Sequence, residues 1–175
     1  MRKTVTFVLF IFCTFLLQST WTTVIPLGGY TPDLLLILVL SMAFMRGRRA
    51  GMLFGMICGI LADLIYMPFI GFSALFFILA GYVAGSSYDV FFSANVKIPM
   101  GMAAIGEFLY GLSKFLVFFF VKNQRGFLAA LRGEILPQTI LTVLLTIPLY
   151  GIYYAFNRKI AVHELEEQQS PWLRK

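Results

Sequence analysis

The feature that most constrains this chain is a succession of long apolar runs separated by short polar segments. A helix of about 20 apolar residues is long enough to cross the hydrocarbon core of a bilayer. With short loops, 175 residues hold about six such runs and leave no room for a separate soluble domain. We therefore predict an all-α membrane protein with six transmembrane helices.

The composition excludes the common soluble classes. Hydrophobic residues make up 59% of the chain and charged residues 13%. A soluble domain is about 45–50% apolar and about 25% charged. A soluble fold of this size cannot bury so many apolar side chains or cover its surface with so few charges, which excludes a soluble enzyme and a disordered protein. The net charge of +6 lies mostly in short loops between apolar runs, so we predict no nucleic-acid partner.

The predicted spans follow the apolar runs. They cover about residues 4–25, 32–45, 50–66, 69–85, 98–121 and 135–156. The first run follows two basic residues, as in a signal peptide, but no A-x-A cleavage site follows it, so we expect an uncleaved span. We predict one six-span domain over residues 1–160 and a polar cytoplasmic tail over residues 161–175.

The second run has the features of a helix start. Pro32 suits the first helical turn, where its missing N–H costs nothing. Thr31 is placed to cap the helix, and Asp33 suits the positive end of the helix dipole. From Pro32 to Met45 the helix is only about 21 Å long. Either residues 27–30 continue this helix, or the bilayer thins around it.

The lysines and arginines predict the orientation in the membrane, because basic residues accumulate in cytoplasmic loops. With the N-terminus inside, ten of the 14 basic residues lie in inside loops, three lie outside and Lys114 lies within a span. Both termini are therefore predicted to be cytoplasmic. The densest inside group is Arg46, Arg48 and Arg49. This group either sets the topology or also contacts anionic lipid headgroups, at about 1 kcal/mol per basic residue.

Glycines four residues apart mark the third and fourth runs. They are Gly47, Gly51, Gly55 and Gly59 in the third run, and Gly81 and Gly85 in the fourth. Glycine lets helix backbones approach closely, and packing drives helix association within lipid. We predict that these glycine-rich faces pack helices together inside the bundle, and the alternative is a surface that binds another protein.

Three ionisable residues lie inside predicted spans: Asp63, Glu107 and Lys114. A charge near the bilayer centre costs about 2.5–3.5 kcal/mol, so each should face the interior and be paired. Glu107 and Lys114 share a helix face but are about 10 Å apart along the axis. We therefore expect Lys114 to lie between the two acids and to pair with Asp63 on another helix. These residues form a structural clasp, lie near the lipid headgroups, or belong to a proton or ion pathway.

Patterns of catalytic residues are missing from the sequence. The only histidine, His163, begins the stretch HELEE, which lacks the second histidine of a zinc site. The sequence contains neither a nucleophile elbow nor a phosphate-binding loop. Asp63 and Glu107 resemble no known carboxylate dyad. We predict that the chain is not an enzyme and holds no metal or cofactor.

Three stretches, in order, resemble the MreD family of rod shape-determining membrane proteins. They are TPDLLLILVLSMAF, GMLFGMICGILADLIY and GFSALFFILAGYVAG. The resemblance covers nearly the whole chain and is most specific between Pro32 and Gly85. The positions that match the family pattern are Pro32, Asp33, Gly51, Gly55, Gly59, Asp63, Gly71, Gly81 and Gly85. The resemblance assigns them to helix packing or partner docking.

The resemblance implies a non-catalytic, multi-pass component of the bacterial inner membrane that belongs to the cell-elongation machinery. Members of the family associate with MreC. Directly or through MreC, they help couple MreB filaments to peptidoglycan synthesis by RodA and the elongation transpeptidase.

A second resemblance leads to another class. The substrate-binding subunits of energy-coupling-factor vitamin transporters also have six spans and a glycine-rich helix that ends in an acid. They carry an alanine-x-x-x-alanine face in the first span, whereas the first alanine of this chain is Ala43. This difference favours the rod-shape family, although a shared architecture would explain both likenesses.

Overall fold

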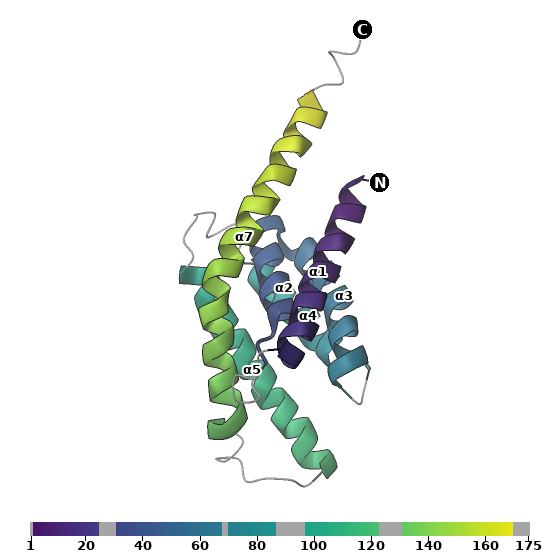
Figure 1. Ribbon diagram of the computed structural model, residues 1–175. Coiled ribbons are helices and arrows are strands. Elements are labelled where there is room, and N and C mark those ends of the chain that lie inside the picture. The colour runs from purple at the N-terminus through teal and green to yellow at the C-terminus, as the bar shows by residue number, and fades with distance from the viewer. Residues whose placement is uncertain (1, 25–30, 68–69, 87–96, 123–130, 170–175) are drawn as a thin grey trace.

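A computed structural model of the chain describes residues 2–24, 31–67, 70–86, 97–122 and 131–169. These residues form six α-helices and one π-helical turn, with no β-strand among them (Figure 1). The elements are α1 (Arg2–Val24), α2 (Leu34–Arg46), α3 (Arg48–Tyr66), α4 (Phe72–Ser86), α5 (Lys97–Lys122), η1 (Leu131–Ile135) and α7 (Leu136–Gln169). The predicted all-helical class is confirmed.

One predicted helix start is wrong, and one helix continues beyond its predicted span. α2 begins at Leu34 rather than at Pro32, and residues 27–30, the alternative extension of this helix, lie outside the described residues. The apolar stretch Leu131–Asn157 agrees with the predicted end of the sixth span near residue 156, but the helix α7 itself continues to Gln169. Its polar second half contains no glycine or proline, and Pro171 lies just beyond it. Good helix formers without a breaker continue a helix whether or not lipid surrounds them.

Helix length separates the elements into two groups. Three stretches are long and apolar enough to cross a membrane: Arg48–Tyr66, Met100–Val117 and Leu131–Asn157. The apolar stretch of α1 is shorter, as are α2, with 13 residues, and α4, with 15 residues. At 1.5 Å per residue, α2 is about 20 Å long and α4 about 22 Å long. That α1, α2 and α4 also cross the membrane stays a prediction.

The short helix α2 is the centre of the bundle. It contacts each of the other five helices. Ten consecutive residues, Leu34–Ala43, are buried in it. A helix that is apolar on every side has no polar face to turn to water, so it is stable only when it is surrounded. The uninterrupted run of leucine, isoleucine and valine in α2 is therefore a consequence of its central position.

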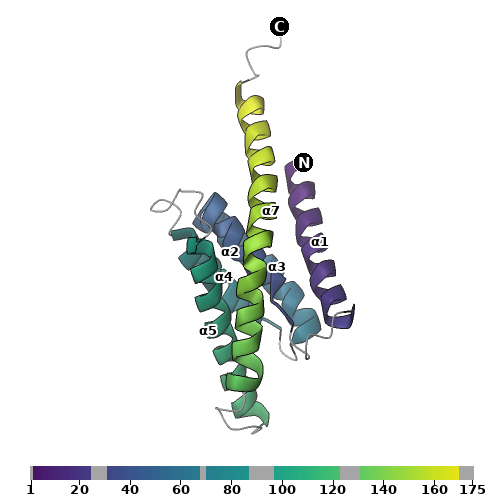
Figure 2. The same cartoon turned by 60° about the vertical axis from the view of Figure 1, so that its left-hand side comes forward.

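The remaining helices pack around α2 as two pairs and a single helix. α3 and α4 form an antiparallel hairpin on one side, and α5 and α7 run beside each other on the other side (Figures 1 and 2). α1 contacts α2 and reaches α7 through the ring of Phe10, which stacks on Phe156 at 4.8 Å. The N-terminal end of α1 and the C-terminal end of α7 lie at the same end of the bundle (Figure 1).

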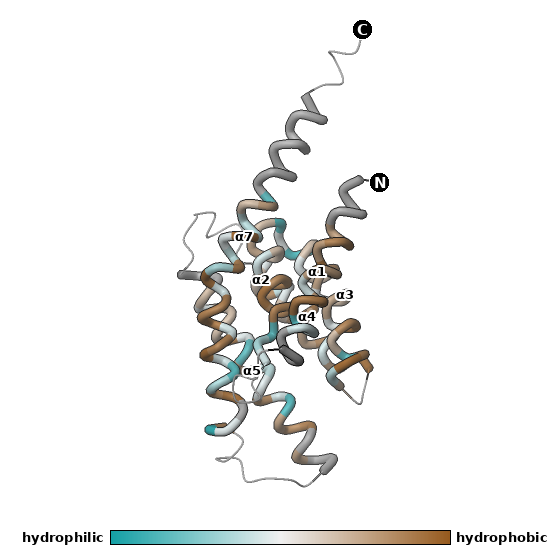
Figure 3. Tube along the Cα trace, viewed as in Figure 1, coloured by the Kyte–Doolittle hydropathy of each residue, from teal (hydrophilic) through white to brown (hydrophobic). Residues whose placement is uncertain are grey.

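Apolar side chains cover the outside of the bundle as well as its core. Leu75 on α4 is 73% exposed, and Leu9 on α1 and Leu64 on α3 are each 61% exposed. Hydrophobic colouring covers much of the helices in Figure 3, interrupted by short hydrophilic stretches. A soluble protein rarely exposes so much apolar surface, whereas a lipid-embedded protein requires it.

Candidate functional site: a buried polar cluster and a glycine seam

Asp33 is the residue immediately before α2 and lies deep inside the bundle. Its side chain is buried, and its carbonyl oxygen accepts the first helical hydrogen bond, from the N–H of Ile37 at 3.2 Å. Asp33 is therefore the N-cap residue, and the expectation that Thr31 caps this helix is wrong. The carboxylate of Asp33 makes no hydrogen bond to its own helix, so it is available to other elements.

The Asp33 carboxylate accepts hydrogen bonds from three other helices. Gln18 Nε2 of α1 donates to Oδ1 at 3.2 Å. Lys114 Nζ of α5 and Gln138 Nε2 of α7 donate to Oδ2, at 3.3 and 3.2 Å. Gln18 also caps α2, because its Oε1 accepts the N–H of Leu35 at 3.0 Å. A side chain from α1 thus does what the cap residue usually does for its own helix.

Glu107 extends this cluster along α5. Its side chain is 1% exposed, and its Oε1 accepts a hydrogen bond from Gln138 Nε2 at 2.8 Å. Gln138 therefore joins the two carboxyl groups. The second oxygen of Glu107, Oε2, is buried without a hydrogen-bond partner. Nearby, the ammonium of Lys114 lies 3.9 Å from the ring centre of Tyr110, an arrangement in which the ring face attracts the cation.

The expected pair between Asp63 and Lys114 is wrong. Lys114 forms its ion pair with Asp33, at 3.3 Å. Asp63, which is fully buried in α3, accepts three backbone N–H groups at the start of α4 instead: Gly71 at 2.8 Å, Ser73 at 2.9 Å and Ala74 at 3.2 Å. The first N–H groups of a helix have no partner within it and carry the positive end of its dipole, so they satisfy the Asp63 carboxylate without a cation.

We expect Asp63→Ala to destabilise the α3–α4 hairpin. Losing a helix cap costs about 0.5–2 kcal/mol, and here three N–H groups lose their acceptor together, two of them in buried residues. Thermal unfolding of the detergent-purified chain should show a lower midpoint for Asp63→Ala, and a smaller loss for Asp63→Asn, which keeps one acceptor oxygen. Ser113→Ala is the control, because it removes only an exposed bond to Leu109 within α5. Equal midpoints for Asp63→Ala and the control would contradict the capping role.

A seam of glycines lies between α3 and α4. The backbones approach so closely that a Cβ atom added at Gly51 would collide with the carbonyl of Gly81, and one at Gly55 with the carbonyl of Phe77. One at Gly59 would collide with the backbone of Ala74. At the other end of the seam, a Cβ at Gly85 would come within 2.6 Å of the backbone of Arg48. In each case the obstacle is backbone, which cannot rotate away as a side chain can.

Two glycines serve the turns, and one of them, Gly47, also borders the seam, because its backbone would lie 2.8 Å from a Cβ added at Gly85. Gly47 joins α2 to α3 and has a φ of 83°, and Gly71 precedes α4 with a φ of 111°. Residues with a Cβ atom rarely adopt such backbone conformations, so glycine is required at both positions. Nothing lies within 4 Å of a Cβ added at Gly71. Gly71 is therefore required for its backbone conformation and not for close helix packing.

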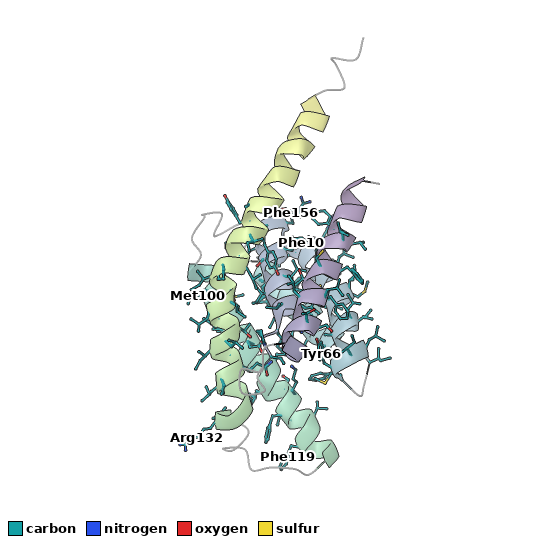
Figure 4. All side chains as sticks on the ribbon, viewed as in Figure 1. Phe10, Tyr66, Met100, Phe119, Arg132 and Phe156 are labelled. Carbon is teal, nitrogen blue, oxygen red and sulfur yellow. The ribbon has the colours of Figure 1, made fainter. Side chains whose placement is uncertain are left out.

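The basic turn between α2 and α3 is partly engaged within the bundle. Arg46 donates from Nε to Asn157 Oδ1 of α7 at 2.7 Å, and its guanidinium lies 4.6 Å from the ring centre of Phe7 on α1. Arg48 and Arg49 are exposed, and the guanidinium of Arg48 lies 5.9 Å from the ring of Tyr82. Arg46 therefore connects three helices at the end where α1 begins. Figure 4 marks this end by Phe10 and Phe156, and the opposite end by Phe119 and Arg132.

Several members of the polar cluster were not recognised in the sequence. Gln18 and Gln138 each join two partners, and Thr142 accepts the backbone N–H of Asp33 at 3.3 Å. The available signal was an amide side chain inside an apolar run, which is costly in lipid unless it is hydrogen-bonded. Among the described residues, no three histidine, cysteine, aspartate or glutamate side chains are grouped so as to hold a metal ion.

Together, these features define an all-helical membrane protein whose short central helix is held by a buried ion pair and by amide side chains from its neighbours. The family model described as rod shape-determining protein MreD matches residues 1–160. The chain therefore belongs to the MreD family, as the resemblance of its sequence indicates, and is a rod shape-determining membrane protein. The family is one of structural proteins that are not known as enzymes. No curated protein sequence and no solved structure matches the chain.

Proposed function

We propose that this protein is a non-catalytic scaffold in the bacterial inner membrane, where it binds MreC. Through MreC or directly, it meets MreB, RodA and the elongation transpeptidase, and so helps couple cytoplasmic filaments to peptidoglycan synthesis. The observation that carries this proposal is the family match, which extends over residues 1–160 and includes every apolar run. The comparisons give no support to the alternative of a transporter subunit.

The charged groups of the interior support a structural role. Asp33 and Lys114 pair with each other, and Asp63 caps α4. Each of these groups is therefore used to hold helices together. A scaffold has to present a defined outer surface, and rigid internal connections between helices provide one.

We propose that all six helices cross the membrane in the six-span domain of residues 1–160, with both termini and the tail of residues 161–175 in the cytoplasm. The beginning of α1, the basic turn after α2 and the end of α7 lie at one end of the bundle, in agreement with the count of basic residues (Figure 1). Arg48 and Arg49, exposed at this end, are placed to contact anionic lipid headgroups, while Arg46 holds helices.

We propose that the glycine seam serves internal packing rather than partner docking. The space above Gly51, Gly55, Gly59, Gly81 and Gly85 is already filled by backbone of the same chain. A partner helix cannot approach these positions unless α3 and α4 separate. MreC therefore docks on a face that is exposed to lipid or water in the chain alone.

Depletion of the protein tests the cellular function. Because wall synthesis along the cell cylinder would lose its membrane scaffold, we expect depleted rods to become round and to swell. Phase-contrast microscopy measures the ratio of length to width, and a second copy of the gene should restore it. Cells that stay rods but fail to take up a vitamin would overturn the proposal in favour of the transporter subunit.

Co-purification tests the partner. MreC should remain with an affinity-tagged copy of the full chain after extraction in mild detergent. An untagged copy of the chain is the control, because the affinity resin does not hold it, and it should carry no MreC. Absence of MreC from the tagged preparation, with the chain itself folded, would contradict direct binding.

A further inference from the structure

Two buried side-chain oxygens among the described residues have no hydrogen bond, Tyr66 Oη and Glu107 Oε2, and only the second belongs to a carboxyl group. Glu107 Oε2 is buried without a partner, and the Glu107 side chain is 1% exposed. Asp33 and Asp63, the other buried acids among the described residues, accept hydrogen bonds at both of their oxygens. A buried, ionised oxygen without a donor costs more than a neutral one, because neither water nor protein replaces its lost hydration.

The charges around Glu107 do not balance when every group is ionised. Two carboxyl groups, Asp33 and Glu107, share the amide of Gln138, and one ammonium, that of Lys114, lies beside them. Fully ionised, the cluster carries one excess negative charge in the middle of an apolar bundle. One added positive charge neutralises it and removes the cost of an unpaired charge in lipid.

We propose that Glu107 Oε2 is a proton-binding site. The added proton forms an O–H bond at Oε2, Asp33 remains the carboxylate that pairs with Lys114, and Oε1 continues to accept from Gln138. The polar and titratable groups connected to the site, directly or through one another, come from every helix of the bundle: Gln18 of α1, Asp33 at the start of α2, Asp63 and Tyr66 of α3, Ser73 of α4, Tyr110 and Lys114 of α5, and Gln138 and Thr142 of α7.

A proton fits this site better than a metal cation does. The ammonium of Lys114 already lies 3.3 Å from Asp33 and opposes a second cation beside it. A metal ion also needs several oxygen ligands, whereas a proton needs only the one free oxygen. The side chain of Lys114 is 23% exposed, so a proton can reach the cluster from that side.

Occupancy of the site controls how firmly α5 is held to the start of α2. With the proton bound, the cluster is neutral and the two carboxyl groups do not repel each other. Without it, the Glu107 carboxylate faces that of Asp33 across the shared Gln138. The stability of the bundle should therefore fall as the pH rises, because the folded state holds a proton that the unfolded chain releases.

Infrared spectroscopy of the full chain in detergent tests the site directly. Wild type at neutral pH should show the carbonyl band of a protonated carboxylic acid, equivalent to one group per chain. Glu107→Gln should lack this band, because the amide supplies an N–H where the acid supplies its O–H. Asp63→Asn, which changes a buried carboxylate whose oxygens are all hydrogen-bonded, should keep it. An identical band in wild type and Glu107→Gln would overturn the proposal.

Thermal unfolding against pH gives a second, independent measurement. Wild type and Glu107→Gln should unfold at the same temperature in mild acid, and wild type should fall below the variant as the pH rises. Parallel curves of unfolding temperature against pH for the two proteins would overturn the proposal. Loss of the infrared band when sodium chloride replaces choline chloride at fixed pH would also overturn it, because the site would then hold a metal cation. None of these outcomes depends on the cellular role proposed above.

Discussion

Gly55→Ala is expected to destabilise the bundle strongly, because Gly55 lies in the middle of the glycine seam. Overpacking a well-packed interior typically costs about 1–3 kcal/mol. At Gly55 the cost should lie at the upper end of that range, because the new Cβ meets the carbonyl and the next backbone nitrogen of α4 rather than a side chain. Relief requires the whole of α4 to move away from α3, which also breaks the contacts at Gly51 and Gly59.

The chain offers matched controls for this substitution. Gly101 in α5 and Gly151 in α7 are also helical glycines, but nothing lies within 4 Å of a Cβ added to either. Alanine has a higher helix propensity than glycine, so Gly151→Ala should leave stability unchanged or raise it by a few tenths of a kcal/mol, up to about 1 kcal/mol. Thermal unfolding and size-exclusion profiles in detergent would show the contrast.

The outcome separates packing from partner binding. If the seam is internal, Gly55→Ala lowers the unfolding midpoint of the purified chain in the absence of any other protein. If Gly55→Ala and Gly151→Ala unfold at the same temperature, and only Gly55→Ala loses MreC in co-purification, the seam is a docking surface. The proposed packing role would then be wrong.

The helical architecture was predictable because lipid leaves the chain few choices. Every backbone N–H and C=O in the hydrocarbon must be satisfied within the segment, so an apolar run of sufficient length becomes a helix. The start of α2 was not predictable in the same way. Thr31 and Pro32 have the local chemistry of a helix start, but the helix begins at Leu34, where Gln18 supplies the cap from a helix that is distant in sequence.

The site was predictable in its residue types but not in its pairings. The cost of charge in lipid identified Asp63, Glu107 and Lys114 as interior groups, and the structure places Asp63 and Glu107 in the core and Lys114 at its edge. Which acid meets Lys114 depends on how each helix rotates about its axis, and spacing along one helix does not determine that. Asp33 was assigned to the dipole of its own helix, whereas its carboxylate holds three other helices.

Substitutions at Asp33 and Lys114 should have the largest effects on the polar cluster. Asp33→Asn removes the negative charge that pairs with Lys114, so the half-buried Lys114 ammonium loses its ion-pair partner. Breaking a buried ion pair by removing one partner costs about 3–5 kcal/mol, because the remaining charge keeps its desolvation penalty. Lys114→Met leaves the opposite charge unpaired, since the buried Asp33 carboxylate then loses the ammonium that pairs with it.

The double variant distinguishes an ion pair from two independent contributions. Asp33→Asn with Lys114→Met leaves no unpaired charge between these two positions, and the asparagine oxygen still accepts from Gln18 or Gln138. Its loss of stability should therefore be smaller than the sum of the two single losses, by about 0.5–3 kcal/mol. Thermal or denaturant unfolding of the four proteins completes the double-mutant cycle, and strictly additive losses would mean that Lys114 is not paired with Asp33.

The same four proteins connect the cluster to cell shape. A bundle whose central helix has lost its partners is expected to be degraded or to dock its partners poorly, so each single variant should fail to restore rods in depleted cells. The double variant should restore them in proportion to its recovered stability. If the double variant is as stable as wild type in detergent yet the cells stay round, then the charges themselves act in the shape machinery, and a purely structural role for Asp33 and Lys114 is excluded.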